Sequence, residues 1–329
     1  MSDDVDESRD HTLPGTDGEL DTPAVEGYSF DGDVSLSELL DSYETTGFQA
    51  THLHEAIQII RKMQDEDAKI FLTFTSNIIS SGLRETIAFL AREDLVDVMI
   101  TTSGSLTEDV IKTMKPFRMG EWDADEAELR EQGINRLGNI YVESDCYVKL
   151  EEWLNEEFFP EFFDEEKLRT PTEVAEGLGE RLDDHDSFLN HAAANDIPVH
   201  CPALTDAEIG NFLFYYRQEQ DEDIGIEILD DWDNLIHEAM DAEKTGIITV
   251  GAGVPKHHAI MSNQFRGGAD YAVYISTGME GDGSLSGAPP NEAVSWGKIK
   301  EEDTNYTQVE AEATLVLPLI VAGAFKDLD

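Results

Sequence analysis

The sequence predicts an α/β protein with a doubly wound, largely parallel sheet in a single large domain. Apolar runs of strand length recur along the chain, and helical patterns separate several of them. In the first helical pattern, Leu83, Ile87 and Leu90 fall at positions i, i+4 and i+7 and make one apolar stripe. Strands that are buried on both faces and alternate with helices are typical of parallel sheets. The predicted strands are IFLTFT (70–75), VDVMITT (96–102), IPVHCPAL (197–204), GIITVGAG (246–253) and YAVYIST (271–277).

The composition separates an N-terminal tail from this domain. Residues 1–24 are rich in Asp, Glu, Gly, Thr and Pro, and we expect them to form an acidic, disordered tail. No linker or internal repeat interrupts residues 25–329. Because 40% of the chain is hydrophobic, this part is able to bury a sizeable core.

The charge of the chain is strongly negative. Asp and Glu number 71 against 22 Lys and Arg, which gives a formal net charge of −49 at pH 7. An excess of this size must cover the whole surface and repel nucleic acid and anionic membranes, which we exclude as partners. The pattern predicts a salt-loving source, since molar salt shortens the Debye length to about 3 Å. A functional acidic tail is the alternative, but the acidic residues are not confined to one end.

Cysteine usage and apolar runs predict the compartment. Cys146 and Cys201 have no paired spacing, which favours a reducing compartment and argues against a disulfide framework or a zinc site. The start of the chain, MSDDVDESRDH, does not resemble a signal peptide. The longest apolar run, TLVLPLIVAGAF, is about half a membrane span and contains a proline. We therefore expect a soluble, cytoplasmic protein without a bound metal.

Each predicted strand runs into small or polar residues. Because parallel sheets collect ligands beyond the carboxyl ends of their strands, we expect these loops to line one pocket, which suits a nucleotide. Small residues let the backbone approach a pyrophosphate, and Asp can hold ribose hydroxyls. For any single loop, turns and helix caps explain the composition equally well, and GAGVPK is not a complete GxGxxG motif. The loops are TSNIISSG, TTSGS, LTDAEIG, GAGVPKHH and TGMEGDGS.

Longer strings in the chain resemble deoxyhypusine synthase. The similarity runs in the same order from about Gly27 to Ala322, and EAVSWGK and ADYAVYI are specific to that family. The matching strings are TTGFQAT (45–51), TSNIISSGLRETI (75–87), VDVMITTSG (96–104), PALTDAEIG (202–210), VPKHHAI (254–260), GADYAVYIST (268–277) and NEAVSWGKI (291–299).

This resemblance implies a fold of NAD-binding (Rossmann-like) type and an NAD-dependent transferase. In the family, NAD takes a hydride from a polyamine, usually spermidine. An enzyme lysine captures the four-carbon aminobutyl fragment as an imine, and the fragment then passes to one lysine of translation initiation factor 5A, here the archaeal factor. Family members are homotetramers with active sites between subunits, so we expect the same assembly.

The motif match assigns the covalent role to Lys298, within EAVSWGKIK (292–300). Transimination needs a neutral amine, and desolvation lowers the pKa of lysine from its usual value of about 10.4. The indole of Trp296 is expected to supply an apolar wall, and Gly297 is expected to remove a side chain that would crowd the approach. The alternative is that Lys298 only pairs with one of many carboxylates.

The string VPKHHAI supplies the candidate base. The match assigns proton removal from the amine to His257, and imidazole suits this because its pKa lies near neutral pH. By composition alone, His258 is an equally good candidate. We expect Lys256, beside them, to be a surface counter-charge.

The matching motifs also predict ligand contacts. A carboxylate and aromatic walls suit a cationic methylene chain, although Glu292 and Trp296 are also spaced as an ordinary pair on a helix surface. The predicted NAD contacts are Ser76, Asn77, Ile78, Ile79, Ser80, Thr102, Ser103, Gly104, Glu108, Asp206, Ala252, Thr277, Gly278, Asp282, Glu312 and Ala313. The predicted substrate contacts are Thr107, Glu108, Asn211, His257, Tyr274, Gly283, Ser284, Leu285, Glu292 and Trp296.

Four positions depart from the spermidine-using pattern. Thr107, Asn211 and Leu285 stand where those relatives carry acidic residues, and Met261 stands where they carry Asn. Loss of these anions should weaken recognition of a triply charged amine, so a smaller donor such as agmatine is favoured. Two other functions stay open: a homospermidine synthase-like transferase acting on small amines, and a catalytically inactive NAD-binding subunit.

Overall fold

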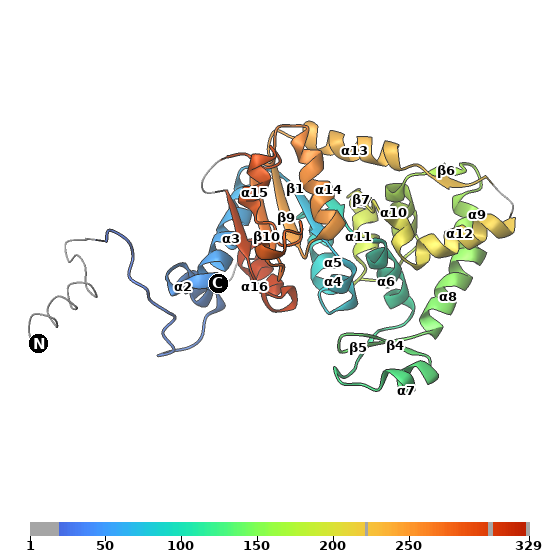
Figure 1. Cartoon of the computed structure of the whole chain (residues 1–329), viewed down its shortest axis with the longest axis horizontal. Helices are drawn as coiled ribbons and strands as arrows, with labels where there is room; N and C mark the ends of the chain where they lie inside the picture. Colours follow the sequence, from blue (N-terminus) through green and yellow to red (C-terminus); the bar gives the residue numbers. More distant parts are fainter. Residues whose placement is uncertain (1–19, 221–222, 302–304, 327–329) are drawn as a thin grey trace, which may run out of the picture.

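A six-stranded parallel sheet forms the centre of the computed structural model, which describes residues 20–220, 223–301 and 305–326 (Figure 1). Its strand order is β11-β10-β9-β1-β2-β7. In chain order within this sheet, the sequence of strands is 6-5-4-1-2-3, the doubly wound arrangement of dinucleotide-binding folds. The predicted fold class is therefore confirmed. The strands are β1 (Lys69–Phe74), β2 (Val98–Ile100), β7 (Val199–His200), β9 (Thr245–Val250), β10 (Tyr271–Ile275) and β11 (Tyr306–Val309).

The five predicted apolar runs each overlap one of these strands, because each strand is buried on both faces of the sheet. Strand β1 pairs in parallel with β9 from Lys69 opposite Thr245 to Phe74 opposite Val250. After β1 the chain builds one half of the sheet, and β9 begins the other half. The carboxyl ends of β1 and β9 therefore mark the point where the strand order reverses, and ligands bind at such points in this fold.

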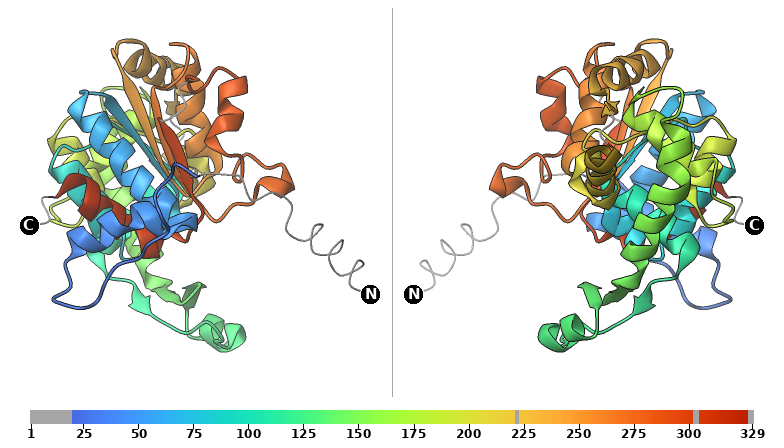
Figure 2. Two further views of the ribbon diagram at one scale, coloured as in Figure 1. Left: turned by 90° about the vertical axis from the view of Figure 1, so that its left-hand side faces the viewer. Right: turned by 90° about the vertical axis from the view of Figure 1, so that its right-hand side faces the viewer.

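Helices cover both faces of the sheet, and each face has its own apolar cluster (Figure 2). Side chains alternate along β1, so that Leu72 belongs to one cluster and Phe71 to the other. The Phe71 face packs against α13 (Ile228–Met240), α14 (Gly253–Gln264) and α15 (Pro290–Ser295). The Leu72 cluster includes residues of α2 (Leu36–Thr46), α3 (Phe48–Asp65), α4 (Ser76–Ser80), α5 (Arg84–Arg92), α6 (Ser103–Met114), α10 (Pro171–Gly179), α11 (Phe188–Ala194), α12 (Glu208–Gln220) and α16 (Ala313–Phe325).

Residues 118–169 form a long insertion between β2 and β7 that the sequence patterns do not predict. A three-stranded antiparallel sheet projects from the body together with a short helix (Figure 1). A two-residue turn at Gly138 and Asn139 joins two of its strands, and Gly138 has a positive φ of 60°. The elements are β3 (Arg118–Met119), α7 (Glu126–Glu131), β4 (Ile134–Leu137), β5 (Ile140–Glu143), α8 (Asp145–Trp153) and α9 (Phe159–Phe162), and farther along β6 (Leu168–Arg169) pairs with β8 (Gly225–Ile226).

The ends of the chain and the longest apolar run complete the fold. Residues 1–19 of the predicted tail lie outside the described residues, and residues 20–24 are exposed without helix or strand. The apolar run forms α16, in which Leu317 and Ile320 are buried against the core. In the described ranges, no helix is both long and apolar enough to cross a membrane. Cys146 and Cys201 are buried and free.

We expect the net charge of −49 to make the fold dependent on salt. In dilute buffer, unscreened repulsion among carboxylates opposes the compact state. Dialysis from molar potassium chloride into dilute buffer should therefore reduce the helical circular dichroism signal and lower the melting temperature, and restoring the salt should reverse both changes. A native spectrum with an unchanged melting temperature in dilute buffer would contradict this expectation.

Candidate active site

A pocket of about 520 Å³ lies between α14, α15 and β10, on the Phe71 face of the sheet. Helix α14 follows β9, and the segment between β10 and α15 closes the opposite wall. Lys298 lines this pocket together with six of the predicted substrate contacts and Met261. The six are His257, Tyr274, Gly283, Leu285, Glu292 and Trp296.

Lys298 is held by its backbone on both sides. Its N–H donates to the carbonyl of Ala293 in α15 at 3.0 Å, and its carbonyl accepts from the N–H of Ala269 at 3.0 Å. Gly297 makes the turn between α15 and Lys298 with a φ of +67°. A Cβ at Gly297 would meet no atom of this chain within 4 Å, so packing within the chain does not require a glycine here. Its left-handed backbone conformation favours glycine.

The side chain of Lys298 meets the candidate base. Lys298 is 8% exposed, and its Nζ lies 3.2 Å from Nε2 of His257. Burial lowers the pKa of Lys298, and the carboxylate of Glu292 opposes this shift. Burial and the neighbouring Lys298 both lower the pKa of His257. The two shifts increase the neutral fractions of both groups, as a nucleophilic amine and a proton acceptor require.

The two adjacent histidines have different environments. His258 packs on Trp232 of α13 with ring centroids 4.4 Å apart, and burial is the main cause that lowers its pKa to about 4. It does not line the pocket. Composition left the two histidines equivalent, and the geometry favours His257 as the partner of Lys298.

The aromatic wall is open to solvent in the single chain. The Lys298 Nζ lies 5.5 Å from the Trp296 ring, but Trp296 is 63% exposed. Glu292 is also exposed, one turn earlier on the same helix. Trp296 and Glu292 therefore form the outer lip of the pocket.

Lys256 is not the surface counter-charge that its sequence context suggested. It is 3% exposed and lines the same pocket, and burial lowers its pKa to about 8. Its Nζ donates to the carbonyls of Leu285 at 2.9 Å and Ala288 at 2.7 Å. The expectation was wrong because the segment before α15 folds over α14, a long-range contact with no local sequence signal.

Three predicted substrate contacts lie away from this pocket. Thr107 and Glu108 are buried in α6, and Asn211 is exposed on α12. Ser284 does not line it either, and its hydroxyl accepts from the N–H of Ser286 at 3.2 Å. The Lys298 pocket takes residues from two of the five predicted loops: Lys256 and His257 from GAGVPKHH, and Gly283 from TGMEGDGS.

The predicted NAD contacts follow the carboxyl ends of the parallel strands. Residues 76–80 form α4 after β1, and residues 102–104 lead into α6 after β2. Glu312 is the N-cap of α16 and accepts from the N–H of Thr314. The remaining contacts are Asp206 in a 3₁₀ turn after β7, Ala252 after β9, Thr277 and Gly278 after β10, Asp282 in a 3₁₀ turn (Glu280–Asp282) farther along that loop, and Ala313 beside Glu312.

The local geometry of these segments fits a nucleotide. The N–H of Ser76 donates to the Thr102 hydroxyl at 3.1 Å, so no side chain caps α6. A Cβ on Gly104 would lie 2.8 Å from the Cβ of Ser76. The Ser103 hydroxyl is buried without a partner in the described structure. An uncapped helix N-terminus beside closely packed small residues leaves backbone N–H groups available for a phosphate.

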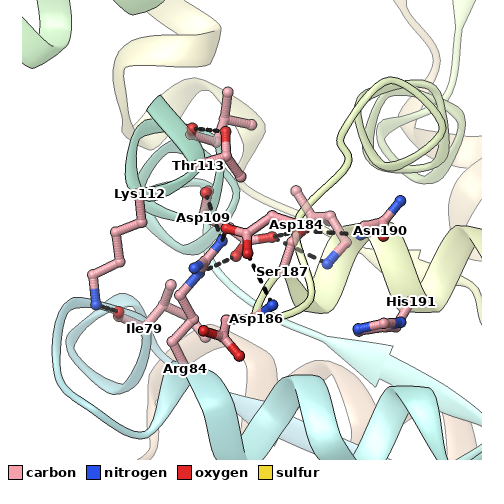
Figure 3. A network of polar contacts seen from close by, with 12 residues as sticks. Ile79, Arg84, Asp109, Lys112, Thr113, Asp184, Asp186, Ser187, Asn190 and His191 are labelled. Carbon is pink, nitrogen blue, oxygen red and sulfur yellow. Dashed lines mark hydrogen bonds and ion pairs between the residues drawn. The ribbon is translucent and has the colours of Figure 1, made fainter. Parts of the chain in front are cut away.

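A buried acid and a lysine fix the end of α4. Glu108 accepts from the Ser80 hydroxyl at 2.5 Å, and burial raises its pKa to about 7 against the effects of Ser80 and Lys112. Lys112 donates to the carbonyl of Ile79 at 2.6 Å (Figure 3). It also donates to the carbonyls of Ser80 and Ser81, both at 2.9 Å. No local sequence pattern marks Lys112, because its role depends on carbonyls about 30 residues away.

A buried ion pair joins the elements around this segment (Figure 3). Arg84 of α5 donates to Asp109 of α6 at 2.6 Å and to Asp184 at 2.9 Å. The second oxygen of Asp109 accepts from the Ser187 hydroxyl at 2.6 Å and from the N–H of Leu189 at 3.1 Å. Three elements, α5, α6 and α11, are thus tied together behind the predicted NAD segment.

Comparisons with known proteins agree with the motifs. A family model for deoxyhypusine synthase matches residues 38–324. A curated Halobacterium salinarum protein, described as a probable deoxyhypusine synthase, is 69% identical over 99% of this chain and 99% of its own length. A Pyrococcus abyssi protein with the same description is 45% identical over 94% of this chain and 96% of its own length.

A solved structure shows the same fold. This Entamoeba histolytica protein, assigned to deoxyhypusine synthase, has 28% identity and a TM-score of 0.68, and the match covers 93% of this chain and 98% of that one. The Halobacterium relatives support the predicted salt-loving source. Matches of this extent place the chain in the deoxyhypusine synthase family of transferases, whose reaction passes an aminobutyl group to a lysine.

Proposed function

We propose that this enzyme transfers an aminobutyl-type group from a polyamine or related amine to one lysine of archaeal translation initiation factor 5A, in the cytoplasm and with NAD. The observation that carries the proposal is the contact between Lys298 and His257, whose nitrogens lie 3.2 Å apart inside a pocket. A catalytically inactive subunit would not need this pair. The motif match and the family assignment support the same reaction.

The side chains have distinct roles in this proposal. His257 accepts a proton from the amine nitrogen of the donor as hydride leaves the adjacent carbon, and the C–N bond becomes an imine. Neutral Lys298 attacks the imine carbon, and the bond from this carbon to the original donor nitrogen breaks. The four-carbon fragment is then bound to the Nζ of Lys298, and the rest of the donor leaves as an amine. The acceptor lysine then displaces Lys298 by the same transimination. Glu292 holds a cationic end of the donor, and Trp296 shields the methylene chain. NAD, when bound, supplies the hydride acceptor and returns the hydride.

We assign the NAD site to the loops at the carboxyl ends of the strands. Uncapped α6, the tight packing of Gly104 on Ser76 and the buried Ser103 hydroxyl support this assignment. Lys112 and Glu108 keep α4 in position beside them.

Asn211 is exposed on α12 and lies away from the pocket, and we propose that a second copy of the chain presents it to Lys298, in a homotetramer. The open lip at Trp296, which is 63% exposed, is where that copy would close the site.

The donor should be a smaller amine than spermidine. Leu285 lines the pocket without a charged group, and Glu292 is the predicted contact there that has a carboxyl group. Loss of one charged partner in a desolvated site costs about 2–5 kcal/mol of binding free energy. A donor with fewer charges therefore loses less binding free energy than spermidine does. In a competition at equal concentrations, agmatine should give more NADH and more label transfer than spermidine.

A single substitution tests whether the missing charge at Leu285 determines the preferred donor. Leu285→Asp places a carboxylate at the pocket wall and should increase the use of spermidine relative to agmatine. The same assay, run with and without the factor, separates transfer to the protein from transfer to a small amine. A clear preference of the wild-type enzyme for spermidine would show that other side chains replace the missing charges.

A further inference from the structure

We propose that Lys256 is a positioning residue for the amine pocket, and this inference rests on the proposed function. Its Nζ holds the wall segment 283–289 through the carbonyls of Leu285 and Ala288, at 2.9 and 2.7 Å. The same Nζ lies 4.3 Å from the centroid of the Tyr274 ring, on β10. Lys256 therefore connects α14, β10 and the wall segment at one buried point.

The wall segment is well suited to being held in this way. It folds back on the loop after β10, and a Cβ on Gly287 would lie 2.1 Å from the carbonyl oxygen of Met279. The N–H of Gly287 donates to the carbonyl of Ser284, and that of Ala288 to Leu285, so these contacts stabilise the segment internally. The bonds from Lys256 attach this internally folded segment to α14.

The position of the segment determines the shape of the site. Its residues Gly283, Leu285, Ala288 and Pro289 line the pocket, and α15 follows directly with Glu292. Lys256 makes its hydrogen bonds with this wall, whereas Lys298 faces His257. Loss of the anchor should therefore weaken amine binding while the nucleophile and the NAD site keep their geometry.

The test compares three variants. Lys256→Met keeps the length of the side chain and removes its donors, and it should raise the KM for the amine about tenfold or more, since hydrogen bonds from a charged donor are lost. The kcat at saturating amine and the Kd for NAD should change less than about threefold. Lys256→Arg keeps the charge and the donors and should recover most of the KM. Lys149→Met, at an exposed lysine of α8, is the matched control and should behave as wild type.

Hydrogen exchange provides a second readout that does not need activity. In Lys256→Met, amides of residues 283–289 should exchange faster, whereas those of α13 should not change. If Lys256→Met does not fold, Lys256→Gln, with a shorter neutral donor, should show an intermediate KM and the same local exchange. If Lys256→Met leaves both the KM for the amine and the exchange at 283–289 unchanged, the proposal is overturned. It is also overturned if the Kd for NAD rises by the same factor as the KM for the amine. If the wild-type protein shows no transfer, the proposed function fails, and the exchange experiment still tests the anchor.

Discussion

Lys298→Arg should abolish transfer to the factor while leaving the Kd for NAD near the wild-type value. Arginine keeps the positive charge, but its guanidinium stays protonated and cannot form the imine. Removal of a covalent nucleophile typically costs several orders of magnitude, and we expect a loss of at least about 10⁴-fold in kcat. The measurement is label transfer from amine to factor at saturating NAD.

Lys300→Arg is the matched control for this variant. Lys300 lies two residues farther along, pairs with Asp270 at 2.5 Å and does not line the pocket. Its replacement should leave transfer within about threefold of wild type. Transfer by Lys298→Arg at the wild-type rate would exclude the covalent role of Lys298.

Arg84→Met should produce the largest loss of stability. The change leaves Asp109, which is fully buried, with only the Ser187 hydroxyl and the Leu189 N–H. Removing one partner of a buried ion pair typically costs about 3–5 kcal/mol. We expect a loss of this size in the free energy of unfolding, measured by denaturation in molar salt. Arg92→Met, at a partly exposed arginine near the end of the same helix, should cost less than about 1 kcal/mol.

The loss in Arg84→Met should depend on pH in a defined direction. Burial already raises the pKa of Asp109, and Arg84 opposes this shift. Without Arg84 the pKa rises further, so the folded state holds a proton that the unfolded state releases above its own pKa of about 3.9. Stability of the variant should therefore fall as pH increases through the range between the two pKa values. A deficit equal at pH 5 and pH 8 would contradict this account.

Much of the fold could be predicted because parallel strands are buried on both faces. Their apolar runs are continuous, and five of the six strands were predicted from such runs. Strand β11 was missed because its polar Gln308 interrupts the apolar pattern. The insertion at residues 118–169 was missed because its strands are two to four residues long and its sheet projects from the body.

The candidate site was predicted less completely than the fold. Short sequence motifs identified Lys298 and His257. In the structure, Nζ of Lys298 lies 3.2 Å from Nε2 of His257. Burial of Lys256 and the carbonyl contacts of Lys112 depend on segments about 30 residues away. Sequence patterns describe neighbours along the chain, so they did not reveal these contacts.

The central claim is that Lys298 is the covalent carrier, and trapping the imine tests it most directly. The enzyme is incubated with NAD and labelled amine, reduced with borohydride, digested and analysed by mass spectrometry. We predict that the label is on the peptide containing Lys298, that it is absent in Lys298→Arg, and that it is retained in Lys300→Arg. Label on Lys256 or another lysine, or no label on Lys298 while transfer to the factor proceeds, would contradict the claim.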